Sequence, residues 1–113
     1  MKTRSSKAKG MRLQNWVRDE LLSRFKTLNS NDIYCAIMGE TGTDIKLSNT
    51  ARKFLPYSFE CKNRETFKGT YDIIKQAQNN CTINQIPIGV IKMNKFEPLV
   101  IIDAKHFFDL VRK

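Results

Sequence analysis

The sequence predicts a mixed α/β fold, in which helices flank a central mixed β-sheet and the elements follow the order α-β-β-β-α-β-β-α. Two observations predict this class. The first part of the chain has apolar residues at three- and four-residue steps, as in an amphipathic helix, whereas short apolar runs bounded by turn residues follow it. With 113 residues, of which 41% are hydrophobic, the chain is long enough for one packed core and too short for two.

The first helix is predicted from about Lys9 to Leu28, and "NSND" at 29–32 ends it. Its apolar stripe consists of Leu13, Trp16, Val17, Leu21 and Phe25. Residues 1–9 are basic and rich in Ser, Thr and Ala, so we expect them to form a flexible arm. The folded domain then spans residues 10–113.

An antiparallel meander of three strands is predicted next, at residues 33–38, 43–47 and 57–62. The segment "GETG" turns the chain between the first two strands. Between the second and third, Ser48 or Asn49 is expected to cap a single helical turn over residues 50–53. Pro56 then returns the chain to an extended conformation.

A second helix is predicted over residues 70–80, with Ile73, Ile74 and Ala77 on one side. The apolar run at 86–93 then predicts a buried strand. A helix followed by such a strand indicates a crossover to a parallel neighbour.

A last strand at 98–102 and a short helix at 104–113 close the predicted domain. Phe107, Phe108 and Val111 of that helix are expected to face the core. His106, the one histidine in the sequence, lies beside Phe107 and is expected to have a structural role.

The charge of the chain indicates a polyanionic partner. Twenty Lys and Arg stand against eleven Asp and Glu, which gives a net charge of +9. A membrane-surface protein is disfavoured because no basic helix has a broad apolar face. The basic start of the chain lacks the apolar run of a signal peptide, and no later run approaches the length of a membrane span, so we expect a cytoplasmic protein.

Three cysteines, Cys35, Cys61 and Cys81, form an odd set without a CxxC pair. Neither a disulfide framework nor a zinc site is therefore indicated. We expect all three to be reduced, buried thiols.

One group of residues suggests chemistry. Side chains alternate along a strand, so Glu60 and Lys62 point to the same face while Cys61 points to the other. Asp44 lies on the preceding strand, and neighbouring strands run about 5 Å apart, so its carboxylate can approach Glu60. An exposed cross-strand pair of little energetic value is the alternative reading of Glu60 and Lys62.

Two carboxylates and a lysine match the needs of phosphodiester cleavage. Mg²⁺, with Mn²⁺ as a substitute, prefers oxygen ligands, which Asp44, Glu60 and the backbone carbonyl of Cys61 supply. Such a cation neutralises charge on the scissile phosphate and lowers the pKa of a bound water. Lys62 is placed to position or help deprotonate that water and to stabilise developing negative charge.

The glycine-containing turn, then "TDI" at 43–45, a gap, and "ECK" at 60–62 resemble the PD-(D/E)xK nuclease superfamily, with Thr43 at the position of the proline. Within it, the chain most resembles the archaeal-type Holliday junction resolvases and their phage-encoded relatives. The similarity extends to the basic arm, the "KG" at 9–10 and the strand "PIGVIK" at 87–92. It implies a restriction-endonuclease-like core, Mg²⁺-dependent cleavage of branched DNA, and a homodimer that cuts paired strands symmetrically.

The resemblance also implies further site residues. Resolvases of this type commonly carry an acidic residue four positions after the "KG" glycine, where this chain has Gln14, which contributes no charge to a second metal. Glu20 is six residues further along and points to a different face, which makes it a poor substitute. Gln76 and Lys92 correspond to polar residues that flank the active site in related nucleases.

The basic residues of the arm, of the first helix and of the region around the predicted site are expected to contact DNA phosphates, since phosphate neutralisation dominates such affinity. The expected DNA-binding residues are Arg4, Ser5, Ser6, Lys7, Lys9, Arg12, Arg52, Lys53, Arg64 and Lys92. A merely solvated basic tail is the alternative for the arm.

Two other functions remain open at this point. The first is another nuclease of the same superfamily, which nicks duplex DNA or cuts flaps in repair, recombination or homing. The second is a non-catalytic basic module that binds nucleic acid and whose acidic residues are structural. The two nuclease readings differ in the DNA structure they cut, and the binding module differs from both because it needs no Mg²⁺.

Overall fold

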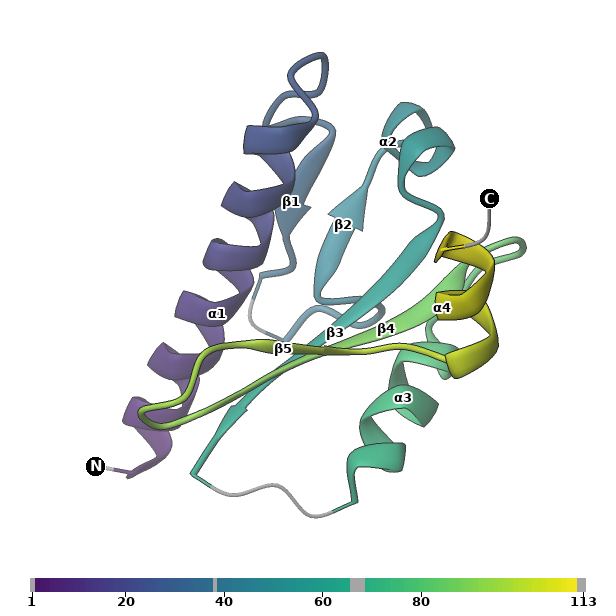
Figure 1. The fold of residues 1–113 in the computed structure, drawn as a ribbon. Coiled ribbons are helices and arrows are strands. Elements are labelled where there is room, and N and C mark those ends of the chain that lie inside the picture. The colour runs from purple at the N-terminus through teal and green to yellow at the C-terminus, as the bar shows by residue number, and fades with distance from the viewer. Residues whose placement is uncertain (1, 38, 66–68, 112–113) are drawn as a thin grey trace.

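The structure, a computed structural model, describes residues 2–37, 39–65 and 69–111. The chain is a compact α/β protein with mixed sheets and helices (Figure 1). Its elements are α1 (Lys2–Arg24), β1 (Ile33–Cys35), β2 (Ile45–Leu47), α2 (Asn49–Phe54), β3 (Tyr57–Arg64), α3 (Thr70–Asn79), β4 (Ile86–Met93), β5 (Leu99–Ile101) and α4 (Ala104–Val111). None of the helices in the described ranges is long and apolar enough to cross a membrane.

The strands form two sheets, so the prediction of one central sheet that begins with a three-stranded meander is wrong in this respect. β1 and β2 pair as an antiparallel hairpin, with Cys35 opposite Ile45. β3 instead belongs to a second sheet, in the order β3-β4-β5. Because β2 is only three residues long and leads directly into α2, its ladder does not continue along β3.

The second sheet confirms the predicted crossover. β3 and β4 are parallel, from Tyr57 opposite Ile86 to Arg64 opposite Met93, and α3 connects them. β5 then pairs with β4 in the antiparallel direction. A backbone hydrogen bond of 3.2 Å from Asp44 N to Phe59 O joins the end of the β1–β2 hairpin to this sheet.

α1 begins at Lys2, so residues 2–9, which the sequence indicated as a separate arm, continue the first helix. The Lys, Arg and Ala residues of this segment are favourable helix formers, which explains why the helix extends beyond the apolar stripe. The side chains of residues 2–6 lie outside those that the structure describes, and the expected DNA contacts of Arg4, Ser5 and Ser6 fall among them.

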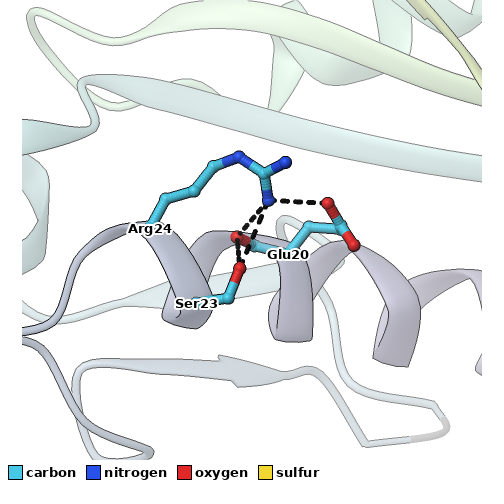
Figure 2. Close-up of polar contacts among 3 residues, drawn as sticks. All are labelled: Glu20, Ser23 and Arg24. Carbon is cyan, nitrogen blue, oxygen red and sulfur yellow. Dashed lines mark hydrogen bonds and ion pairs between the residues drawn. The ribbon is translucent and has the colours of Figure 1, made fainter.

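One face of α1 packs on the second sheet. Leu13 and Val17 are buried in a core that also contains Phe59, Cys61 and Val90. Trp16, expected within the same apolar stripe, is about half exposed at 46%. On the outward surface of α1, Arg24 Nη1 pairs with Glu20 Oε1 at 2.6 Å and also contacts the Glu20 carbonyl and Ser23 Oγ (Figure 2).

The predicted helical turn before β3 is present as α2, and Ser48 is its N-cap. Ser48 Oγ accepts a hydrogen bond from Ala51 N at 3.0 Å and donates one to Asp32 Oδ1 at 2.7 Å. This hydroxyl, together with the N–H of Asn29, lowers the pKa of Asp32. The cap therefore ties α2 to the loop that precedes β1.

α3 covers the face of the second sheet opposite to α1. Its buried residues are Ile73 and Ala77, as the periodicity predicted, and Ser58 Oγ on β3 donates to the Ala77 carbonyl at 3.1 Å. Gly89 on β4 allows this close approach, because a Cβ there would lie 3.1 Å from Cγ2 of Ile73. β3 is therefore enclosed between α1 and α3 (Figure 1).

α4 differs most from the prediction. Phe107, Phe108 and Val111 were expected to face the core, but all three are about half exposed or more, and α4 has no buried residue. The contact with the body is instead polar, since His106 Nε2 lies 3.0 Å from the hydroxyl of Tyr57. The expected structural role of His106 agrees with this contact.

Candidate active site

Asp44 is held against the edge of β3. Its backbone carbonyl accepts from Ala36 N at 2.8 Å, which extends the β1–β2 hairpin, and its own N–H donates to Phe59 O. Its side-chain Oδ2 accepts a 2.7 Å hydrogen bond from Cys61 N. Asp44 therefore lies beside the "ECK" segment, although it precedes β2 and the sheet of β2 does not include β3.

Glu60 and Lys62 point to the same face of β3, the one that α3 covers. Glu60 is only 2% exposed, and its Oε2 lies 3.2 Å from Nζ of Lys62, whose side chain is 25% exposed. The other carboxylate oxygen of Glu60, Oε1, is buried without a hydrogen-bond partner among the described residues. A buried carboxylate oxygen without a hydrogen-bond partner destabilises the folded state. Such an unpaired oxygen is unusual in an ion pair that has only a structural role.

The three side chains act on one another electrostatically. Burial raises the pKa of Glu60, and the negative charge of Asp44 raises it further, whereas Lys62 partly opposes both. Burial also raises the pKa of Asp44, whereas the hydrogen bond from the N–H of Cys61 and the positive charge of Lys62 lower it by smaller amounts. Two carboxylates thus compete for one ammonium group in a partly desolvated place, which favours the binding of an additional cation.

The backbone N–H and C=O groups of Cys61 also point to the Asp44 side of β3. Within a strand the N–H and C=O of a residue point to the same edge. Because the Cys61 N–H points to Asp44, its carbonyl oxygen also lies on the Asp44 side of β3. The Cys61 thiol is buried in the core on the α1 face, where desolvation raises its pKa well above the usual value.

All three cysteines are free, as predicted. Only Cys61 among them is fully buried, however, whereas Cys35 and Cys81 are partly exposed. The prediction of three buried thiols is therefore correct for one of them.

Gln14 approaches Asp44 from the α1 side. The two residues line a cavity of about 180 Å³, together with Lys7, Gly10, Met11, Ala36, Ile37, Gly39 and Glu40. The Oε1 atom of Gln14 is buried and has no partner among the described residues. Asp44 therefore shares a cavity with Gln14 and also interacts electrostatically with Glu60, and both of these residues have an unpaired buried oxygen.

Glu20, the other acidic side chain of α1 considered for this role, pairs with Arg24 on the outward surface (Figure 2). It does not line the cavity beside Asp44. Its location agrees with the sequence argument that six residues along a helix lead to a different face.

Lys46 is a residue near the site that the sequence reasoning missed. Its positive charge lowers the pKa of Asp44, and its ammonium donates to the Thr41 carbonyl at 2.8 Å and pairs with Glu40 Oε2 at 3.5 Å. These contacts close the loop between β1 and β2 that precedes Asp44. The spacing Asp44-x-Lys46 repeats the spacing Glu60-x-Lys62, and this repetition was the available signal.

Two predicted residues do not join the carboxylates. Gln76 lies on α3 with its side chain exposed. Lys92 is opposite Asn63 in the ladder, so it points to the face away from Glu60. Its ammonium instead donates to the carbonyls of Met93 and Phe96, which stabilises the turn between β4 and β5.

The expected DNA-binding residues are divided between two ends of β3. Lys7, Lys9 and Arg12 lie on the first half of α1, and Lys9 Nζ donates to Asn94 Oδ1 in the β4–β5 turn at 2.9 Å. Arg64, which is exposed, ends β3 and belongs to this first group. The second group, Arg52 and Lys53, lies on α2 before β3 begins, and Arg52 contacts Thr82 Oγ1 at 3.3 Å.

The donor set fits a hard cation that keeps several waters. Within the described part of the chain, no three His, Cys, Asp or Glu residues gather into a metal-binding group. Two carboxylates and one carbonyl are enough for Mg²⁺, which is usually held by one or two carboxylates together with substrate phosphates. A site for Zn²⁺, which takes four protein ligands in structural sites, does not fit these residues.

Comparisons with family models, with characterised proteins and with solved structures found no match to this chain. The function is therefore inferred from the residues of this chain and from their arrangement. The observations that bear on the function are the contact of Asp44 with β3, the burial of Glu60 and the unpaired oxygens of Glu60 and Gln14.

Proposed function

We propose that the chain is a magnesium-dependent endonuclease that hydrolyses phosphodiester bonds in branched DNA, with four-way junctions as the substrate class. The observation that carries the proposal is the bare, buried Oε1 of Glu60 beside Asp44 and Lys62. A cation bound there would satisfy this oxygen and relieve the repulsion between the two carboxylates. The resemblance to the PD-(D/E)xK superfamily supports the same assignment.

In this proposal Asp44, Glu60 and the Cys61 carbonyl hold Mg²⁺. When bound, Mg²⁺ supplies charge neutralisation at the scissile phosphate and a water of lowered pKa. Lys62 is close to Glu60 and partly open to solvent, so its ammonium can orient the attacking water and stabilise negative charge as it develops. The N–H of Cys61 orients the Asp44 carboxylate and opposes the rise in its pKa that burial causes.

Gln14 and Lys7 line the cavity on the other side of Asp44. A neutral amide and an ammonium group there suit a phosphate group of the DNA or a water bound to the metal. With no charge at Gln14, we infer a single metal per site. The basic first half of α1 supplies contacts to the phosphate backbone.

Cleavage of a labelled four-way junction in the presence of Mg²⁺ tests the proposal. We expect the wild-type chain to cut the junction faster than a flap or a linear duplex of the same sequence, and EDTA to stop all cleavage. Lys62→Met is expected to slow cleavage about a hundredfold or more, because the ammonium acts at the reacting phosphate. Lys26→Met, a change at an exposed lysine in the loop after α1, is the matched control and should cut like the wild type.

The rival functions give different results in the same assay. A nuclease for flaps or nicked duplexes would cut those substrates faster than the junction. A non-catalytic module would bind all of them with a steep dependence on salt and cut none, and Lys62→Met would leave its binding unchanged.

A further inference from the structure

A cavity of about 250 Å³ lies between the β1–β2 hairpin, α2 and the loop that joins α3 to β4. The polar and aromatic residues in its lining include Tyr34, Thr43, Lys46, Arg52, Asn80 and Thr82. We call this space the Tyr34 cavity. Thr43 directly precedes Asp44 in the chain, so the Tyr34 cavity adjoins the candidate active site.

The charge of its lining distinguishes the Tyr34 cavity from the other two. Lys46 and Arg52 line it, and none of its described lining residues is Asp or Glu. The cavity beside Asp44 and a cavity of about 330 Å³ between α3, α4 and β4 each have two carboxylates in their lining. The Tyr34 cavity is therefore the one that favours an anionic ligand.

Arg52 is the cation that this cavity leaves available. Lys46 already pairs with Glu40 at 3.5 Å, whereas Arg52 is exposed and forms no ion pair within the described ranges. Arg52 Nη1 donates to Thr82 Oγ1 at 3.3 Å, and Gln85 Oε1 accepts from Thr82 N at 2.8 Å. These contacts position the guanidinium, whose remaining N–H groups can bind a phosphate.

Tyr34 supplies an aromatic wall next to these cations. It is opposite Lys46 in the β1–β2 ladder, so the two side chains lie on the same face of the hairpin. Ile33 and Ile45, which precede them, are buried in the core on the other face. Tyr34 is 48% exposed. An exposed aromatic ring beside a cation is the combination on which proteins bind the base and the phosphate of a nucleotide.

We propose that the Tyr34 cavity binds one unpaired nucleotide of a DNA strand, with its phosphate on Arg52 and its base stacked on Tyr34. The Asn80 amide offers both a donor and an acceptor to the edge of that base. This inference rests on the proposed function and gives it a basis for branch selectivity. Bases of an intact duplex stay in their stack, whereas bases at a branch or in a single strand leave it at lower cost.

Fluorescence anisotropy of labelled DNA in EDTA tests the cavity separately from catalysis. Tyr34→Ala should weaken the binding of a short single-stranded oligonucleotide and of a four-way junction about tenfold, because the stacking surface is lost. Binding of a linear duplex should change by about twofold at most, since its bases remain stacked. Tyr34→Trp should bind as tightly as the wild type. Tyr71→Ala, at a tyrosine of α3 that is 85% exposed, is the matched control.

Arg52→Met should weaken single-strand binding to a similar extent but with a different dependence on salt. Loss of one phosphate contact should reduce the slope of log K against log salt concentration by about 0.7. Tyr34→Ala should leave the slope unchanged, because stacking releases no counterions. Arg24→Met, which removes an exposed arginine on α1, is the control and should change neither the affinity nor the slope.

Three results would overturn the proposal: unchanged single-strand binding by Tyr34→Ala, equal weakening by Tyr71→Ala, or an equal loss for the linear duplex. Polyglutamate that binds the wild type but not Arg52→Met, while the oligonucleotide binds both equally, would assign the cavity to an acidic protein and would also refute it. Tyr34→Leu, which keeps an apolar side chain without a ring, serves if Tyr34→Ala does not fold. Circular dichroism checks folding in each case.

The outcomes for this cavity and for the nuclease proposal are separable. A chain that binds the junction through Tyr34 but does not cut it with Mg²⁺ would refute the nuclease proposal alone. A chain that cuts the junction while Tyr34→Ala binds DNA like the wild type would refute the nucleotide cavity alone.

Discussion

Replacement of Glu60 by glutamine is expected to abolish Mg²⁺-dependent cleavage while it leaves the protein as stable as the wild type or more so. Cleavage should fall about a thousandfold or more, because the amide cannot supply the negative charge that holds the metal. The free energy of unfolding without Mg²⁺ should stay constant or rise by about 1 kcal/mol, since a desolvated carboxylate with an unpaired oxygen is removed. In the variant, water can solvate the Lys62 ammonium, because the Lys62 side chain is partly exposed.

The stability difference between Glu60→Gln and the wild type should also depend on pH. The pKa of Glu60 in the folded protein is raised above its ordinary value of 4.5. The stability that this group contributes is therefore complete below pH 4.5 and is lost as the pH rises through the folded pKa. Because glutamine does not ionise, the advantage of the variant should grow over that interval, as chemical denaturation at a series of pH values would measure.

Glu20→Gln is the matched control for Glu60→Gln. Glu20 also pairs with a basic residue, but on the exposed surface of α1 (Figure 2). We expect it to change stability by no more than about 0.5 kcal/mol and to leave cleavage unchanged. A Glu60→Gln variant that is markedly less stable than the wild type but cleaves normally would identify Glu60 as a structural ion-pair partner.

Asp44 is expected to have two separable roles, and a pair of variants distinguishes them. Asp44→Asn and Asp44→Ala should both reduce cleavage about a thousandfold or more, since both remove the charge. Asp44→Ala should in addition be about 1–3 kcal/mol less stable than Asp44→Asn, because it leaves the Cys61 N–H without an acceptor, whereas an asparagine oxygen can still accept. Cleavage assays and thermal unfolding measure the two effects.

Asp103→Asn and Asp103→Ala form the control pair for Asp44. Asp103 Oδ2 also accepts a backbone N–H, from His106 at 3.2 Å, at an exposed position before α4. Neither change should affect cleavage at saturating Mg²⁺. Normal cleavage by Asp44→Asn would contradict the metal-binding role, and equal stability of the two Asp44 variants would contradict the structural one.

The local arrangement of the candidate site follows from patterns visible in the sequence. Alternation along a strand predicts that Glu60 and Lys62 share a face, and their 3.2 Å contact agrees with it. The glycine turn before Asp44 and the crossover through α3 are equally local signals. The hydrogen bond from Cys61 N to Asp44 could not be predicted, because Asp44 lies in the loop before β2 and β2 belongs to a different sheet from β3.

The differences from prediction have a common physical origin. Periodicity shows that a segment has an apolar face, but it does not show which partner covers that face. α4 has the predicted apolar face, yet Phe108 and Val111 point outward because His106 on the polar side meets Tyr57. In the same way, the apolar pattern of β2 indicates a strand without showing that it pairs with β1 alone.

Lys92 and Gln76 show the corresponding limit for the site residues. Both were placed by resemblance along the chain, which does not determine the face to which a side chain points. The parallel register of β3 and β4 turns Lys92 away from Glu60, and its ammonium stabilises the β4–β5 turn instead. Lys46, in contrast, approaches Asp44 through a spacing that was visible in the sequence.

The most direct test of the metal site is the anomalous scattering of manganese in crystals of the wild-type chain soaked with Mn²⁺. We predict one strong anomalous peak per chain, at a position where carboxylate oxygens of Asp44 and Glu60 and the carbonyl oxygen of Cys61 would hold the ion. Glu60→Gln crystals soaked in the same way should lack the peak. A wild-type crystal with no peak between Asp44 and Glu60, or with a peak only elsewhere, would contradict the account.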